Sequence, residues 1–99
     1  MGAENSENVL CSADFQIENR FGLHARPASV FVQSALLFQS EISVRNLASD
    51  MEADGKSVMS LLMLAASCGT RIRVSARGPD SREALQCLGS LIQRGFDDE

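Results

Sequence analysis

The chain has 99 residues, of which 44% are hydrophobic and 22% charged, and its formal net charge is −4. This length predicts one small domain with a modest core. The acidic balance argues against a general nucleic-acid-binding protein, which needs a basic face to displace counterions.

Cysteine usage and the lack of targeting signals bear on the cellular compartment. No two cysteines have the CxxC spacing of a zinc or redox site, so we expect free thiols at Cys11, Cys68 and Cys87, as in a reducing cytosol. The first residues lack the features of a signal peptide, and no apolar run is long enough to span a membrane. These features favour a cytoplasmic protein.

The first predicted element is a strand that begins at Asp14. Phe15 and Ile17 alternate there with polar residues, as expected for a strand with one buried face. Residues 1–12 are polar and lack periodicity, so we expect them to form a flexible extension. The folded domain is then predicted to span residues 13–95.

A helix is predicted over residues 27–39, where apolar side chains recur at helical spacing. Pro27 fits only in the first turn of a helix, where its missing N–H costs no hydrogen bond. The helix should therefore begin at about Ala25, which leaves His24 at or near the N-cap.

A β-hairpin is predicted next. Residues 41–46 alternate between polar and apolar, with Ile42 and Val44 inward. A turn at residues 47–50 leads to a short strand at residues 51–53, which can pair directly with the first.

A short apolar helix is predicted to open at Ser57 and to reach about Ala66. Gly69 lies just past that end, which is typical of a helix C-cap. Leu61 and Leu64, three residues apart, are expected on the side that faces the core.

The last strand and helix have the clearest patterns. Residues 71–76 alternate strictly between polar and apolar. Asp80 with Glu83 three residues later indicates a capping box, and the apolar stripe after it predicts a helix to Gly95. Residues 96–99 are predicted to be an acidic tail.

These elements predict the order β-α-β-β-α-β-α. Because the strands alternate, one face of the sheet should be solvated and all helices should pack on the other face. The predicted fold is a two-layer α/β sandwich with a largely antiparallel sheet.

His24 is the only histidine in the chain. At a helix N-terminus, free backbone N–H groups can bind an anion, and the helix dipole disfavours an imidazolium, so a neutral, nucleophilic ring is expected. Arg26 adds a fixed charge and a forked donor. This combination suits a histidine that accepts and passes on a phosphoryl group, although a simple cap or surface role for His24 remains open from spacing alone.

Other catalytic chemistry finds little support in the sequence. A single histidine predicts no metal site, and we expect no cofactor. No Ser-His-Asp or Cys-His arrangement is recognisable, so an independent hydrolase or transferase is a weak alternative.

The segment 55–66 is apolar nearly all round, which indicates either a fully buried helix or one with an exposed apolar face. In the second case Val58, Met59 and Leu62 would form a docking surface for partner proteins. Ser57 is interpreted first as the N-cap of this helix. A regulatory phosphate at Ser57, close to Lys56 and the helix dipole, is the alternative.

Three segments together resemble the HPr family, the histidine-containing phosphocarriers of the bacterial phosphotransferase system. They are GLHARPA at 22–28, GKSVMSLLMLAA at 55–66 and GPDSREAL at 78–85. The similarity covers residues 13–95 in the family's order of elements. It implies an open-faced sandwich with three helices on one side of a four-stranded sheet.

The resemblance also implies a function in sugar transport or its regulation. His24 would be phosphorylated on Nδ1 by phosphorylated enzyme I, with phosphoenolpyruvate as the ultimate donor, and would pass the phosphoryl group to an enzyme IIA. Arg26 matches the family's active-site arginine, and the open N–H groups of Ala25 and Arg26 would bind the phosphate. Such a protein is expected to be a monomer that binds no nucleic acid and does not insert into membranes.

Further positions match regulatory and docking features of the family. Ser57 matches a serine that a dedicated kinase phosphorylates in many bacteria, and Val58, Met59 and Leu62 match the partner-contact face. Phe21 departs from the pattern, since many members have a polar residue there that reaches the phosphate. A regulatory binding protein of the nitrogen branch, acting through partner docking, is the alternative function.

Overall fold

The computed structural model describes residues 9–98, and the elements within them follow the predicted order. They are β1 (Leu10–Gln16), α1 (Ala25–Ala35), β2 (Glu41–Asn46), β3 (Glu52–Asp54), α2 (Val58–Met63), β4 (Arg71–Arg77), α3 (Ser81–Gln93) and the 3-10 turn η2 (Gly95–Asp97). None of the helices in this part of the chain has both the length and the apolar character needed to cross a bilayer.

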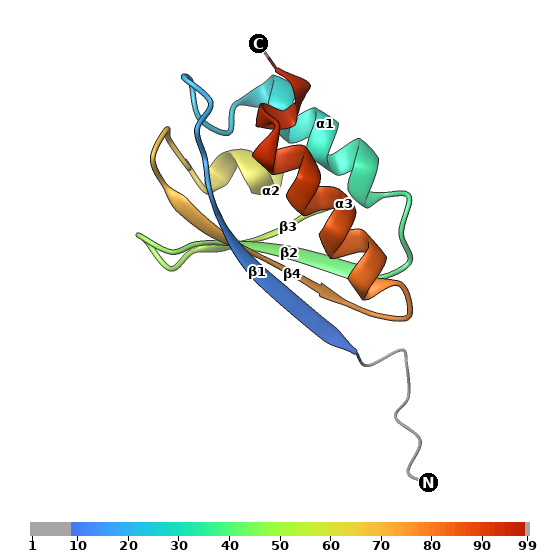
Figure 1. The fold of residues 1–99 in the computed structure, drawn as a ribbon. Coiled ribbons are helices and arrows are strands. Elements are labelled where there is room, and N and C mark those ends of the chain that lie inside the picture. Colours follow the sequence, from blue (N-terminus) through green and yellow to red (C-terminus); the bar gives the residue numbers. More distant parts are fainter. Residues whose placement is uncertain (1–8, 99) are drawn as a thin grey trace, which may run out of the picture.

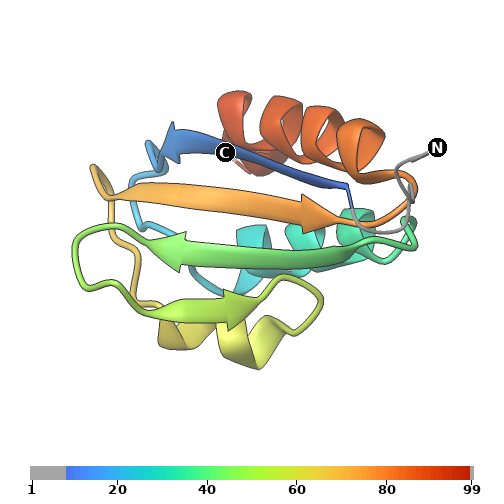
Figure 2. The same cartoon turned by 90° about the horizontal axis from the view of Figure 1, so that it is seen from below.

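The strands form one antiparallel sheet in the order β1-β4-β2-β3, which is seen face-on in Figure 2. All three helices lie on one face of this sheet and leave the other face open (Figure 1). The predicted fold class, an open-faced two-layer sandwich, is therefore confirmed. The predicted hairpin is also present, as β2 and β3.

The core lies between the sheet and the helices because each strand alternates as predicted. Ile42 and Val44 of β2 are buried, and β4 contributes every second residue from Ile72. The helices meet this face with their apolar stripes. Their buried apolar residues include Ala28, Phe31, Val32 and Ala35 of α1, Leu61 of α2, and Ala84, Leu88, Leu91 and Ile92 of α3.

Strand β1 begins earlier than the sequence predicted. Its pairing with β4 runs from Leu10 opposite Arg77 to Gln16 opposite Arg71. The expected boundary between extension and domain at residue 13 is therefore wrong, because the inward positions of the strand continue through Ala13 to Cys11, which are small residues with a weak apolar signal. The rest of the predicted extension, residues 1–8, lies outside the described residues.

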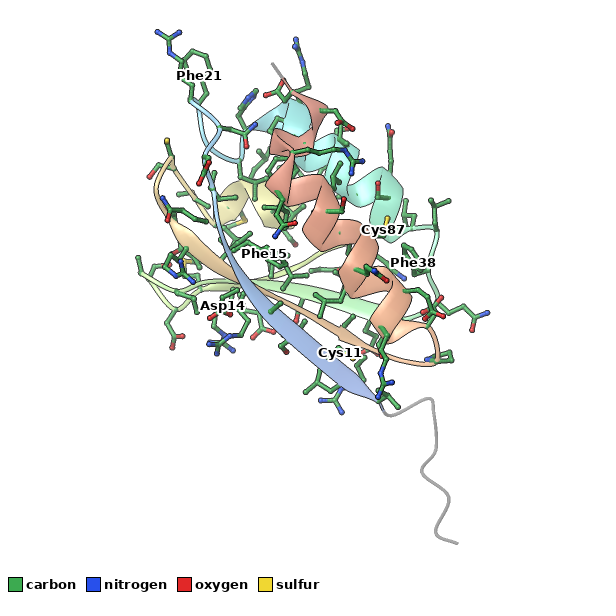
Figure 3. The ribbon with its side chains drawn as sticks, in the orientation of Figure 1. Cys11, Asp14, Phe15, Phe21, Phe38 and Cys87 are labelled. Carbon is green, nitrogen blue, oxygen red and sulfur yellow. The ribbon has the colours of Figure 1, made fainter. Side chains whose placement is uncertain are left out.

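The contact between β1 and α3 depends on a missing side chain. A Cβ atom on Gly89 of α3 would lie 2.7 Å from Cζ of Phe15, so the Phe15 ring fills the place where another residue would have its side chain. Figure 3 shows Phe15 between β1 and α3. This close approach brings the end of α3 towards the loop that follows β1.

Helices α1 and α2 are shorter than predicted. Helix α1 begins at Ala25, as expected, but ends at Ala35, and the next residues, Leu36 and Leu37, are largely exposed. The chain there turns towards β2 instead of continuing along the core.

Helix α2 ends at Met63, where Leu64 is the C-cap and Ala65 takes a positive φ of 50°. The prediction that Gly69 caps this helix is wrong. Gly69 lies in the turn before β4, because a left-handed residue had already ended the helix.

The residues after α3 are not a solvated tail. Phe96 is 1% exposed and belongs to the core, and η2 turns the chain back after α3. The predicted acidic tail at 96–99 is wrong for the residues that the structure describes, because burial of the apolar Phe96 side chain in the core holds this segment against the fold. Glu99 lies outside the described residues.

Asp80 is the N-cap of α3, but the predicted capping box does not form, since its side chain makes no cap hydrogen bond. Its carboxylate instead accepts hydrogen bonds from the backbone N–H groups of Gln39 and Ser40 and from the Ser40 hydroxyl. The hydrogen bond from the Ser40 hydroxyl is the main cause that lowers the pKa of Asp80 below its usual value of 3.8, and the two backbone bonds add to it. The carboxylate thus ties the start of α3 to the turn after α1.

We expect Asp80→Asn to lower the melting temperature at pH 7 and to lose this effect in acid. Because the native pKa of Asp80 lies below the unfolded value, its ionised form stabilises the fold above about pH 4, and this stability disappears as the pH falls through the native pKa. Thermal melts of the variant and of Glu83→Gln, which removes a charge from the same turn, check this. A melting-temperature deficit that persists unchanged at pH 2 would contradict it.

Candidate functional site

The loop between β1 and α1 sets the position of His24. Gly22 has a φ of +71°, and a Cβ atom there would lie 2.6 Å from the backbone oxygen of Ala66. The next N–H, that of Leu23, donates to the same oxygen at 2.8 Å. The loop is thereby held against the segment after α2, and His24 follows as the N-cap of α1 with extended backbone angles.

The first turn of α1 leaves two backbone donors free. The N–H of Ala28 donates to the oxygen of His24 at 3.0 Å, and Pro27 has no N–H. Among residues 9–98, no acceptor is found for the N–H groups of Ala25 and Arg26. Two donors at the positive end of a helix form a site for an anion next to the imidazole.

The His24 ring contacts a carboxylate that the sequence did not identify. Its Nε2 atom lies 3.2 Å from Oδ2 of Asp98, and Nη1 of Arg26 lies 3.7 Å from the other oxygen of that carboxylate. The Asp98 side chain is 12% exposed, compared with 38% for His24 and 78% for Arg26. Asp98 lay in the predicted acidic tail, and the only sequence signal of its placement was the apolar Phe96 two residues before it.

One wall of the site is aromatic. The rings of Phe21 and His24 meet edge to face with centroids 6.1 Å apart, and Cζ of Arg20 lies 5.3 Å from the Phe21 centroid. Phe21 is 73% exposed, and Figure 3 shows it projecting from the tip of the loop. A side chain at this position therefore offers an apolar surface and no hydrogen bond to a bound anion.

The His24 side chain opens onto a hollow of about 840 Å³ between this loop, β1 and the end of α3. Its lining contains positive and negative side chains, among them Arg26, Arg71, Asp14 and Asp98. Within residues 9–98, no three side chains of the metal-binding types are grouped so that they could hold an ion.

Ser57 caps α2, as predicted, by accepting a hydrogen bond from the N–H of Ser60 at 3.2 Å. The neighbouring Lys56 ammonium donates to the backbone oxygen of Phe38 at 2.8 Å. The Lys56 ammonium therefore binds the turn after α1, whereas we had expected it to lie close to a phosphate on Ser57.

Helix α2 has one buried and one exposed face. Leu61 and Leu64 are buried, as predicted, and Met59 is 69% exposed, so the alternative of an entirely buried helix is wrong. Val58 and Leu62 are partly buried against the core. Met63, which the sequence did not single out, is also 69% exposed and lies one turn from Met59.

Comparison with known proteins agrees with this fold. The family model described as "PTS HPr component phosphorylation site" matches residues 11–94. Phosphocarrier protein HPr of Neisseria meningitidis is 42% identical over 87 residues, which cover 88% of this chain and 96% of that protein. Phosphocarrier protein NPr of Proteus mirabilis is 39% identical over 83 residues, which cover 84% of this chain and 91% of that protein.

Longer proteins and solved structures match as well. The multiphosphoryl transfer protein of Salmonella typhimurium is 39% identical over 92% of this chain, but the chain spans only 24% of its length. The crystal structure of HPr-C-His from Thermoanaerobacter tengcongensis superposes with a TM-score of 0.83 and 38% identity, covering 90% of this chain and 98% of that one.

The fold and site together define a class of small proteins: open-faced sandwiches with a histidine at the N-cap of the first helix, next to unpaired backbone N–H groups. With the matches of the family model and of its relatives, the chain belongs to the HPr family of the phosphotransferase system.

We expect Gly22→Ala to lower the free energy of unfolding by about 2–4 kcal/mol, from the left-handed backbone and the collision with Ala66 together. It should also shift the NMR signals of the His24 ring, because the loop must move away from Ala66. Denaturant unfolding and proton–carbon correlation spectra measure the two effects.

Gly69→Ala is the matched control. Gly69 also has a positive φ, of +93°, but a Cβ atom there would meet nothing within 4 Å. It should cost about 1 kcal/mol for the backbone alone and leave the His24 signals in place. Equal losses of stability in the two variants would mean that the contact with Ala66 does not position the loop.

Proposed function

We propose that this chain is a phosphocarrier that takes a phosphoryl group on His24 from phosphorylated enzyme I and donates it to an enzyme IIA. The observation that carries the proposal is the position of His24 beside the two free N–H groups of Ala25 and Arg26. A negatively charged group bound to the ring would be stabilised by these donors and by the helix dipole.

The proposed step is a nucleophilic exchange. The lone pair of His24 Nδ1 attacks the phosphorus atom, the bond from phosphorus to the donor breaks, and the donor keeps that electron pair. The N–H groups of Ala25 and Arg26 bind the phosphoryl oxygens as they approach, and the Arg26 guanidinium supplies a forked, permanently charged donor. Transfer to an enzyme IIA is the same exchange with the roles reversed.

Docking to both partners is assigned to the surface beside His24. The exposed apolar side chains proposed for this surface are Phe21, whose ring meets that of His24, and Met59, with Met63 one turn further along α2. Val58 and Leu62, also expected in this surface, would contribute through the parts of their side chains that remain accessible. Methionine suits a carrier that must fit more than one partner, because its unbranched side chain adapts to different surfaces.

Ser57 is proposed as a regulatory site. A phosphate on its hydroxyl would place about two negative charges at the start of α2, next to the docking surface. Partners that bind the apolar docking surface would then bind less well, because the phosphate adds charge that must be desolvated. The enzyme that phosphorylates Ser57 would be a serine kinase of the HPr type.

A regulatory protein of the nitrogen branch is the second candidate function. It is favoured by the similarity to the NPr of Proteus mirabilis. The two candidates share the chemistry at His24 and differ in the enzyme IIA that receives the phosphoryl group.

We expect labelled phosphoenolpyruvate and enzyme I to transfer one acid-labile phosphoryl group to the chain, and His24→Ala to abolish the label. His24 makes no side-chain cap bond, so the helix start should survive the substitution. Addition of sugar-type or nitrogen-type enzyme IIA then identifies the branch by the protein that removes the label. Full labelling of His24→Ala would exclude the proposed carrier role.

We expect Met59→Glu to raise the half-saturating concentration of the carrier for enzyme I by about tenfold, because it places a charge in the proposed docking surface. Labelling rates at a series of carrier concentrations measure this. Ser57→Asp should act in the same direction and keep the fold, since aspartate is also a good N-cap.

Leu37→Glu is the matched control for docking. Leu37 is 78% exposed, more than Met59, but lies beyond the opposite end of α1 from His24. Its labelling kinetics should equal those of the unmodified chain. An equal effect of both glutamates would attribute the loss to net charge and remove α2 from the docking surface.

A further inference from the structure

We propose that Asp98 is a positioning residue for His24, which holds the imidazole as the tautomer with its proton on Nε2 and its lone pair on Nδ1. The proposal rests on the proposed function, because it concerns which ring nitrogen can accept the phosphoryl group. It is carried by the contact of 3.2 Å between Nε2 of His24 and Oδ2 of Asp98.

The fold holds Asp98 in place through the segment that precedes it. Gly95, Phe96 and Asp97 have φ values of 71°, 60° and 57°, so three successive left-handed residues turn the chain back after α3. Phe96 is anchored in the core, and the Asn19 amide donates to the backbone oxygen of Gly95 at 2.9 Å. Figure 1 shows the end of the described chain beside the start of α1.

The hydrogen bond has only one possible direction. An ionised carboxylate can accept but cannot donate, so the Nε2 atom of His24 must carry the proton. A neutral imidazole has a single N–H, and the other nitrogen then holds an accessible lone pair. Among residues 9–98 no hydrogen-bond partner is found for Nδ1, which leaves this atom free to act as the nucleophile.

The carboxylate also suits the charge that develops on the ring. When the Nδ1 lone pair forms a bond to phosphorus, the imidazole keeps its proton on Nε2 and becomes positively charged. Asp98 lies against that proton and, at 12% exposure, is shielded from most of the competing water. No proton has to leave the site during the exchange.

Arg26 remains available to the phosphoryl group. Its Nη1 atom is 3.7 Å from the Asp98 carboxylate, beyond hydrogen-bond distance, and its side chain is 78% exposed. The ion pair is therefore weak and screened by solvent, and Arg26 can turn to the phosphate while Asp98 stays on Nε2.

The test measures the tautomer and the rate separately. Nitrogen-15 NMR of the histidine ring at a pH where it is neutral should give the Nε2–H form for the unmodified chain and a mixture of both forms for Asp98→Ala. The rate of labelling by enzyme I should fall about three- to tenfold in Asp98→Ala. Asp98→Asn, whose amide oxygen can still accept from Nε2, should recover part of both.

Asp97→Asn is the matched control, because it removes the same charge from the neighbouring position. Asp97 is 59% exposed, and its carboxylate pairs with Arg94 at 2.8 Å. It should leave the tautomer and the labelling rate unchanged.

The possible outcomes separate this inference from the proposed function. If the unmodified chain takes no label on His24, the carrier role fails. If it is labelled but Asp98→Ala keeps both the tautomer and the rate, Asp98 does not position the ring. A faster rate in Asp98→Ala would also overturn the inference, since the carboxylate would then compete with the phosphoryl group for the donors of α1.

Discussion

The site depends on one backbone contact, the hydrogen bond from the N–H of Leu23 to the oxygen of Ala66. It attaches the loop before α1 to the segment after α2, and the close approach at Gly22 leaves no room for a side chain. Because α1 starts directly after this attachment, the orientation of His24 and of the two free N–H groups follows from it. The contact also holds the segment after α2 close to the start of α1.

The open-faced architecture explains why the first turn of α1 can serve as an anion site. Helices packed on a single face of a sheet have their ends at the rim of the sandwich, where a protein partner can reach them. Because Pro27 has no N–H, it adds no unpaired backbone donor to the first turn. The helix dipole favours negative charge there. In the described structure the carboxylate of Asp98 supplies negative charge next to this turn, since it contacts the ring of His24 at 3.2 Å and the side chain of Arg26 at 3.7 Å.

Local patterns identified most of the fold and the centre of the site. The alternation around Ile42 and Val44 predicted β2 with its correct bounds, and Pro27 predicted the start of α1 and with it the place of His24. Helix ends were predicted less well. The end of α2 at Met63 depends on the left-handed Ala65 and on contacts with the loop before α1, and neither leaves a periodic signal in the sequence.

Short stretches of the chain were enough to predict the sandwich, the position of His24 at a helix N-terminus and the family, because periodicity, Pro27 and the three family motifs are local features. Only the folded chain shows that Asp98 meets the imidazole and that the Asp80 carboxylate accepts from the backbone of Ser40, 40 residues away. Both contacts join segments that are distant in the chain. The first depends on the burial of Phe96 and the second on the packing of α3, and a single apolar residue near Asp98 is too weak a local signal to predict either.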